Sequence, residues 1–126
     1  MKQKIFKDKY HIFEIEYKKS ELNFKNIDEI ISALKSKIDE HPVLAFIAIF
    51  DQYKHTSSLK DSEINPKIKA AKNIVFCFGK ELPTPEVRPR SIGVCETQDS
   101  FILNFLEAPN EMANKTMEEF VKSLAN

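Results

Sequence analysis

Two apolar stretches on either side of the tetrapeptide "TQDS" set the strongest limit on how this chain folds. "RSIGVCE" (90–96) precedes the tetrapeptide, and "FILNFLEA" (101–108) follows it. Two strand-like stretches joined by a short turn predict a β-hairpin. A further stretch, "NIVFCF" (73–78), ends at Gly79 and predicts another strand of the same sheet.

The N-terminal half begins with a predicted strand and continues with the clearest helix of the sequence. "YHIFEIEY" (10–17) carries aromatic and β-branched residues on alternate positions, which predicts a strand. Asn26 then suits the N-cap of a helix, and Pro42 lies just beyond the expected last turn. The apolar residues between them recur at helical spacing, so one stripe of this helix should cover a sheet. The stripe consists of Ile27, Ile30, Ile31, Leu34 and Ile38.

The remaining segments predict one more strand and two more helices. "VLAFIAIF" (43–50) is apolar on both faces, so we expect a central strand buried from both sides. In "NPKIKAAK" (65–72), Asn65 and Pro66 suit the cap and the first position of a short helix. A last helix is predicted by an apolar stripe that consists of Met117, Phe120, Val121 and Leu124.

These elements follow the order β-α-β-(short α)-β-β-β-α, which indicates an α+β fold. We expect a two-layer sandwich with a mostly antiparallel five-stranded sheet and the helices packed on one face. The length of 126 residues fits a single α/β domain over residues 1–126. Because several strands are apolar on both faces, the second face needs a cover. We expect a homodimer through this face or a covering loop at 80–90, and a helix of the same chain is the alternative.

Charge and composition exclude several function classes. Nineteen basic and nineteen acidic residues balance, so no positive field favours nucleic acid. The N-terminus lacks the apolar core of a secretory signal, and the longest apolar run (43–50) is too short to span a bilayer. We therefore expect a cytoplasmic protein that does not bind a membrane. The two cysteines have no metal-ligand spacing, so a structural zinc site is not expected. We expect no other metal and no cofactor.

Three segments resemble domain-of-unknown-function family 302. They are "IFD" (49–51), "IVFCFG" (74–79) and "PRSIGVCETQDSFILNFLEAP" (89–109). The resemblance implies a small α/β fold that tends to dimerise, and it implies no established activity. The chain departs from that family at Gln52, where members often have His, and at Lys80-Glu81, where they have Asn-Pro. The positions that match are Asp51, Phe78, Gly79, Glu96 and Pro109.

The two cysteines lie in neighbouring predicted strands. If Gly79 pairs with Gly93, Cys77 lies opposite Cys95, and directly opposed residues have Cβ atoms about 4.5–5.5 Å apart. That separation is close to disulfide reach. Apolar neighbours favour two buried thiols that only fill the core, and a redox role would need an accessible thiol.

Arg88 and Arg90 are the only arginines in a chain with seventeen lysines, and Pro89 stands between them. A guanidinium group matches carboxylate and phosphate geometry, and the proline fixes the backbone that presents it. These residues are therefore candidates for binding an anion. The alternative is that they pair with glutamates at the surface.

Asp51 and His55 are four residues apart and face each other if that segment is helical. A carboxylate–histidine pair can bind metal or act as a general base, and an exposed position without function is the alternative. We expect a homodimeric binding protein for a small acidic or apolar ligand, with a small anion as the possible partner. A protein–protein interaction module and a thiol-dependent redox protein or enzyme are the alternatives. The candidate ligand-binding residues are Arg88, Arg90, Cys77, Cys95, Asp51 and His55.

Overall fold

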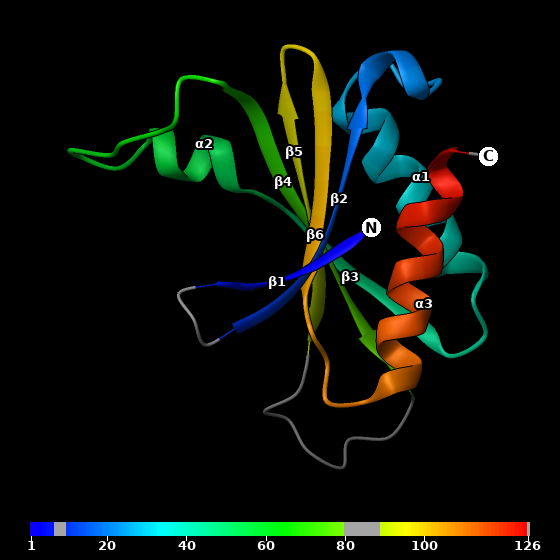
Figure 1. Ribbon diagram of the computed structural model, residues 1–126. Helices are drawn as coiled ribbons and strands as arrows, with labels where there is room; N and C mark the ends of the chain where they lie inside the picture. Colours follow the sequence, from blue (N-terminus) through cyan, green and yellow to red (C-terminus); the bar gives the residue numbers. More distant parts are fainter. Residues whose placement is uncertain (7–9, 80–88, 126) are drawn as a thin grey trace.

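The computed structural model describes residues 1–6, 10–79 and 89–125, and six antiparallel strands form one sheet in this part of the chain (Figure 1). The strand order is β1-β2-β6-β5-β4-β3. The strands are β1 (Lys2–Phe6), β2 (Tyr10–Lys18), β3 (Leu44–Asp51), β4 (Ile68–Phe78), β5 (Arg90–Thr97) and β6 (Ser100–Leu106). The helices are α1 (Ile27–Glu40), α2 (Gln52–Ser57) and α3 (Glu111–Lys122).

The α+β class and the antiparallel sheet are confirmed, but the sheet has six strands instead of five. The missed strand is β1, whose sequence "KQKIF" shows too little apolar alternation to predict a strand. Figure 1 shows α1 and α3 on one side of the sheet and the short α2 on the other. The prediction that helices pack on one face is therefore correct only for the two long helices. Within the described residues, no helix is long and apolar enough to cross a membrane.

The core lies between the sheet and the two long helices, as the apolar stripes predict. Asn26 caps α1, because its Oδ1 atom accepts a hydrogen bond of 3.1 Å from the backbone N–H of Glu29. All five residues of the predicted α1 stripe are buried, and Met117, Val121 and Leu124 at the end of the chain are buried as well. They pack against sheet residues that include Ile74, Phe76, Ile92, Val94, Phe101 and Leu103.

Glu96 is a buried carboxylate on the helix side of β5. It accepts hydrogen bonds from the backbone N–H of Ile27 at 3.0 Å and from the Lys19 Nζ atom at 2.7 Å. Ile27 is the first residue of α1, and the N–H groups of the first turn of a helix have no partner inside that helix. Glu96, one of the positions matched by the resemblance, therefore joins the start of α1 to the sheet and has a structural role.

The position predicted for "VLAFIAIF" is wrong. Within the described residues, β3 pairs with β4 alone and forms an edge of the sheet, with most of its side chains exposed. Its register with β4 shifts between Phe46 and Ala48, which marks a β-bulge. A strand that is apolar on both faces has the same sequence pattern in the centre of a sheet and at an edge. The pattern alone therefore does not show which of the two positions the strand takes.

The short helix predicted at 65–72 is also wrong. Residues from Ile68 onward belong to β4, where Ala71 pairs with Cys95. The Asn65 Oδ1 atom accepts a hydrogen bond from the N–H of Lys67 in a turn that leads into this strand. Pairing with β5 therefore overrides the weak helical preference of "KIKAAK".

Candidate functional site

A row of polar residues crosses the sheet face that lies opposite α1 and α3, called here the open face. Because Ile92 and Val94 are buried in the core, Gly93 between them faces the other way. Register pairs continue from Gly93 across the strands on both sides. The polar row consists of Lys2, Glu14, Asn104, Gly93 and Asn73, on β1, β2, β6, β5 and β4.

Glu14 is the acidic residue of the polar row and lies between Lys2 and Asn104. Its carboxylate accepts a hydrogen bond of 2.8 Å from the Lys4 Nζ atom and lies 3.2 Å from the Lys2 Nζ atom. The Asn104 Nδ2 atom donates to the same carboxylate at 3.3 Å. Burial raises the pKa of Glu14, but the hydrogen bonds from Lys4, Asn104 and Lys2 outweigh burial and leave that pKa below its ordinary value. Glu14 therefore stays ionised and fixes the orientation of the Asn104 amide.

Gly93 leaves space in the middle of the polar row. A Cβ atom at this position would lie 3.0 Å from the Asn104 Oδ1 atom and 3.3 Å from the Asn73 Nδ2 atom. A glycine inside a strand is unfavourable by roughly 0.5–1 kcal/mol relative to alanine, so its presence here has a purpose. Without a Cβ atom at position 93, the side-chain amides of Asn104 and Asn73 can approach the β5 backbone from the two neighbouring strands. Within the described residues, the Asn73 side chain makes no hydrogen bond and remains available to a ligand.

Two hollows meet over the polar row and together form what we call the open-face groove. The first has a volume of about 300 Å³ and lies between α2, residues 63–65 and the sheet. The second has a volume of about 260 Å³ and lies toward the start of β5. Asn73, Gly93 and Asn104 line both hollows, so the two hollows adjoin at the polar row.

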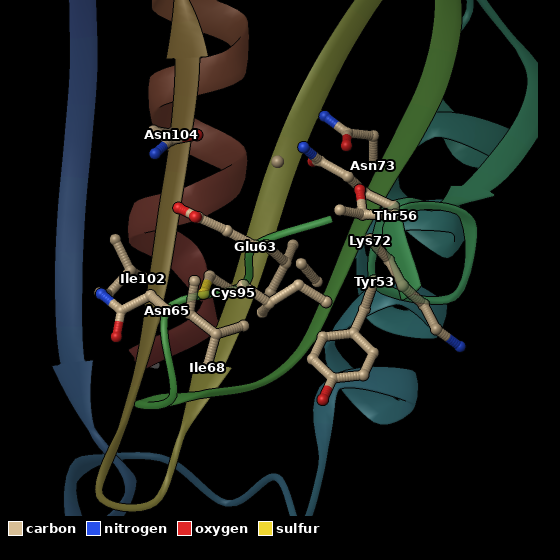
Figure 2. Close-up of a pocket in the computed structure, with 15 residues that line it drawn as sticks. Tyr53, Thr56, Glu63, Asn65, Ile68, Lys72, Asn73, Cys95, Ile102 and Asn104 are labelled. Carbon is tan, nitrogen blue, oxygen red and sulfur yellow. The ribbon is translucent and has the colours of Figure 1, made fainter. Parts of the chain in front are cut away.

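The first hollow has an apolar floor and a wall provided by α2. Figure 2 shows Tyr53 and Thr56 on α2, with Cys95 and Ile102 on the sheet. Lys72 belongs to the same lining, but its ammonium group points away from the hollow in Figure 2. That group lies 2.5 Å from Asp28 and 3.9 Å from Asp51. It therefore supplies no free positive charge to the groove.

Among the described residues that line the second hollow, Arg90 is the only charged one. Its Nη2 atom donates a hydrogen bond to the backbone carbonyl of Leu106, which also lines this hollow, and its buried Nε atom has no hydrogen-bond partner. Burial lowers the pKa of Arg90, although a guanidinium group remains charged in proteins. No carboxylate of the described residues forms an ion pair with it. Of the two candidate arginines, Arg88 lies outside the described residues.

The two cysteines are not opposite each other, so the register proposed for them is wrong. Gly93 pairs with Asn73, which places Cys95 opposite Ala71 and leaves Cys77 opposite Ala45. The offset of six residues separates the cysteines by about 20 Å along the strands. Both cysteines are half-buried, and only Cys95 lines the open-face groove.

Cys95 should react slowly in the native protein, because burial raises the pKa of its thiol and limits access. We expect the Cys77→Ser variant to be alkylated by iodoacetamide several-fold more slowly than free cysteine at neutral pH. Unfolding in urea should restore the ordinary rate, and mass spectrometry over time measures both rates. Equal rates in native and unfolded protein would contradict this expectation and favour the thiol-dependent alternative.

Asp51 and His55 lie at α2 and take separate roles. The Asp51 Oδ1 atom accepts a hydrogen bond of 2.9 Å from the N–H of Lys54 and caps this helix. The His55 ring packs against Phe50, with 5.4 Å between the ring centroids. Neither residue lines the open-face groove. Within the described part of the chain, no group of three or more His, Cys, Asp or Glu residues is placed to hold a metal ion.

Sequence reasoning missed Glu14, Asn73, Gly93 and Asn104. A signal existed for one of them, because Gly93 is a glycine in the middle of a predicted strand. The two asparagines carried no signal of their own, since only the strand register brings them to either side of this glycine.

Comparison with known proteins identifies a family and no activity. Searches of curated proteins and of solved structures found no match. The resemblance to family 302 is not confirmed, because the family model that matches is a different one and covers residues 1–126. The chain belongs to DUF6858, a family of unknown function.

Proposed function

We propose that this protein binds a small carboxylate with an apolar body in the open-face groove. The observation that carries the proposal is Arg90, a half-buried cation that lines the groove without an acidic partner among the described residues. A buried charge is unfavourable unless an opposite charge or several hydrogen bonds compensate it. An anionic ligand would supply that compensation.

The rest of the groove fits the remainder of such a ligand. The Asn73 amide and the Asn104 Oδ1 atom offer hydrogen-bonding groups on either side of Gly93. Ile12 and Leu106 line the second hollow together with Arg90 and offer apolar contacts to the body of the ligand. The two hollows, of about 300 and 260 Å³, lie at the small end of ligand sites. A small metabolite therefore fits better than a large cofactor.

The charge of the groove favours a monoanion. Glu63 lines the first hollow, and its carboxylate would repel a second negative group on the ligand. The Glu14 carboxylate is already paired with Lys2 and Lys4. Arg90 thus has room to bind one carboxylate, and the opposite end of the ligand should be neutral.

We expect hexanoate to bind the wild-type protein more tightly than hexanamide, its neutral counterpart of nearly the same shape. Titration followed by NMR of the backbone and side-chain amides should move the signals of Asn73, Gly93 and Asn104. Arg90→Gln should weaken hexanoate binding at least about tenfold. Arg90→Lys should weaken it less, because lysine keeps the positive charge but lacks the planar guanidinium group that can donate two hydrogen bonds to one carboxylate.

The matched control is Lys115→Gln, which removes one positive charge from an exposed position on α3. This variant should bind hexanoate like the wild type. Equal binding of hexanoate and hexanamide would contradict the carboxylate assignment. Signal changes confined to residues outside the groove would contradict the site.

A further inference from the structure

We propose that a second copy of this chain pairs with the outer edge of β3, so that two sheets join across a two-fold axis. This surface is separate from the open-face groove and does not depend on a ligand. The edge of a sheet presents unpaired N–H and C=O groups that can form hydrogen bonds with another strand. Within residues 1–6, 10–79 and 89–125, only β4 pairs with β3, so its outer edge has no strand partner in this part of the chain.

The two edges of the sheet differ in how they are protected. The other edge strand, β1, has five residues and carries Lys2 and Lys4, and lysines on a short strand oppose pairing with another sheet. β3 has eight residues and carries no charge before Asp51, in a chain of which 30% of the residues are charged. The bulge at Phe46–Ala48 is an interruption in the regular pairing of β3 with β4. β3 therefore lacks the charged side chains that oppose pairing at the β1 edge.

The side chains of β3 are apolar and exposed on both faces. Ile47, Ile49 and Phe50 are 52%, 44% and 43% exposed. Ile49 and Phe50 are consecutive residues of a strand, so they point to opposite faces of the sheet. A bound molecule on one face would leave the other apolar face in water. A strand added at the edge covers both faces together, and this favours a sheet-forming partner.

A second copy also fits the charges beside this edge. On the helix side, the Lys35 Nζ atom lies 4.7 Å from the centre of the Phe46 ring and 2.7 Å from the Asp39 carboxylate. Two antiparallel copies of β3 would bring the two α1 helices side by side in opposite directions. Lys35 of one copy can then face Asp39 of the other, so the pairing desolvates no unmatched charge. An identical strand is neutral and apolar over the same length, which makes β3 complementary to itself.

The homodimer expected from the sequence used the second sheet face. The polar row crosses that face and α2 lies over part of it, so the face is less apolar than expected. The apolar surface lies instead at β3. We therefore move the proposed dimer contact from the open face to the β3 edge.

The first test is the oligomeric state in solution. We expect the wild type to be a dimer by light scattering coupled to size-exclusion chromatography, and Ile47→Lys to weaken dimerisation at least about tenfold, since lysine on an edge strand opposes pairing. Met112→Lys is the control, because Met112 is 70% exposed on α3, a helix that contacts α1 and β2. Circular dichroism checks that both variants fold. A monomeric wild type at every concentration tested, or an Ile47→Lys variant as dimeric as the wild type, would overturn the proposal.

A second test uses disulfide cross-linking to show which residues of the two copies meet. Ile47 lies at the middle of the apolar run and is the residue at the bulge, so symmetric antiparallel pairing about this residue brings the two copies of position 47 close together. Directly opposed Cβ atoms lie about 4.5–5.5 Å apart, near disulfide reach. In a Cys77→Ser, Cys95→Ser background, Ile47→Cys should form a covalent dimer under mild oxidation, and Met112→Cys should not. A dimer that cross-links no faster at position 47 than at position 112 would overturn pairing through β3.

Discussion

Replacing Gly93 by valine should weaken hexanoate binding at least about tenfold, while the protein stays folded. The added Cβ atom would lie 3.0 Å from the Asn104 Oδ1 atom and 3.3 Å from the Asn73 Nδ2 atom. Both are ends of side chains and can move aside, so the backbone of β5 is undisturbed. Valine also suits a strand better than glycine, which offsets part of the crowding. The loss should therefore appear in binding and much less in stability.

The measurement pairs the NMR titration with thermal unfolding, and Gly93→Ala provides a graded comparison. Alanine adds the crowding Cβ atom alone, so it should disturb the Asn104 and Asn73 side-chain amide signals and weaken binding less than valine. Unchanged hexanoate affinity in Gly93→Val would place the ligand elsewhere, even if Arg90→Gln still reduced binding. Loss of affinity in Gly93→Val but not in Arg90→Gln would instead keep the groove and exclude the role given to Arg90.

Elements that are encoded by residues close together in the sequence could be predicted from the sequence alone. The cap at Asn26 and the apolar stripe after it are sufficient for α1, because capping and helical periodicity act within a few residues. The β5–β6 hairpin is likewise encoded by two adjacent apolar stretches and the turn between them. These predictions needed no knowledge of what lies across the sheet.

The position of a strand in a sheet depends on distant partners, and there the sequence was insufficient. "VLAFIAIF" satisfies both a central and an edge position, and its edge position follows only from the pairing of β4 with β5. The register of β4 with β5 was displaced by six residues in the prediction. An even displacement keeps every side chain on the same face of the sheet, so the apolar pattern cannot detect the error.

The same displacement explains why most of the candidate site was missed. Correct register puts Asn73 beside Gly93, whereas the predicted register put Gly79 there. The predicted arrangement brought two cysteines together and concealed two asparagines. Arg90 was identified because a rare residue type stands out in composition, which requires no register at all.

The largest loss of stability among the charged residues should follow from Glu96→Ala. This substitution removes the acceptor of two hydrogen bonds, one from the N–H of Ile27 at the start of α1 and one from the Lys19 Nζ atom. Hydrogen bonds to charged groups each contribute roughly 1.5–3 kcal/mol, and the buried Ile27 N–H would be left without this partner. We expect the free energy of unfolding to fall by about 3 kcal/mol, measured by urea denaturation.

Two matched variants separate the causes of that loss. Glu96→Gln keeps an oxygen that can accept from Ile27 but removes the charge that attracts Lys19, so its free energy of unfolding should lie between those of Glu96→Ala and the wild type. Glu16→Ala removes an exposed carboxylate from β2 and should change the free energy of unfolding by no more than about 0.5 kcal/mol. If Glu96→Ala were as stable as Glu16→Ala, the start of α1 would be held by its apolar stripe and the Asn26 cap alone. The matched position Glu96 would then need a role other than joining the helix to the sheet.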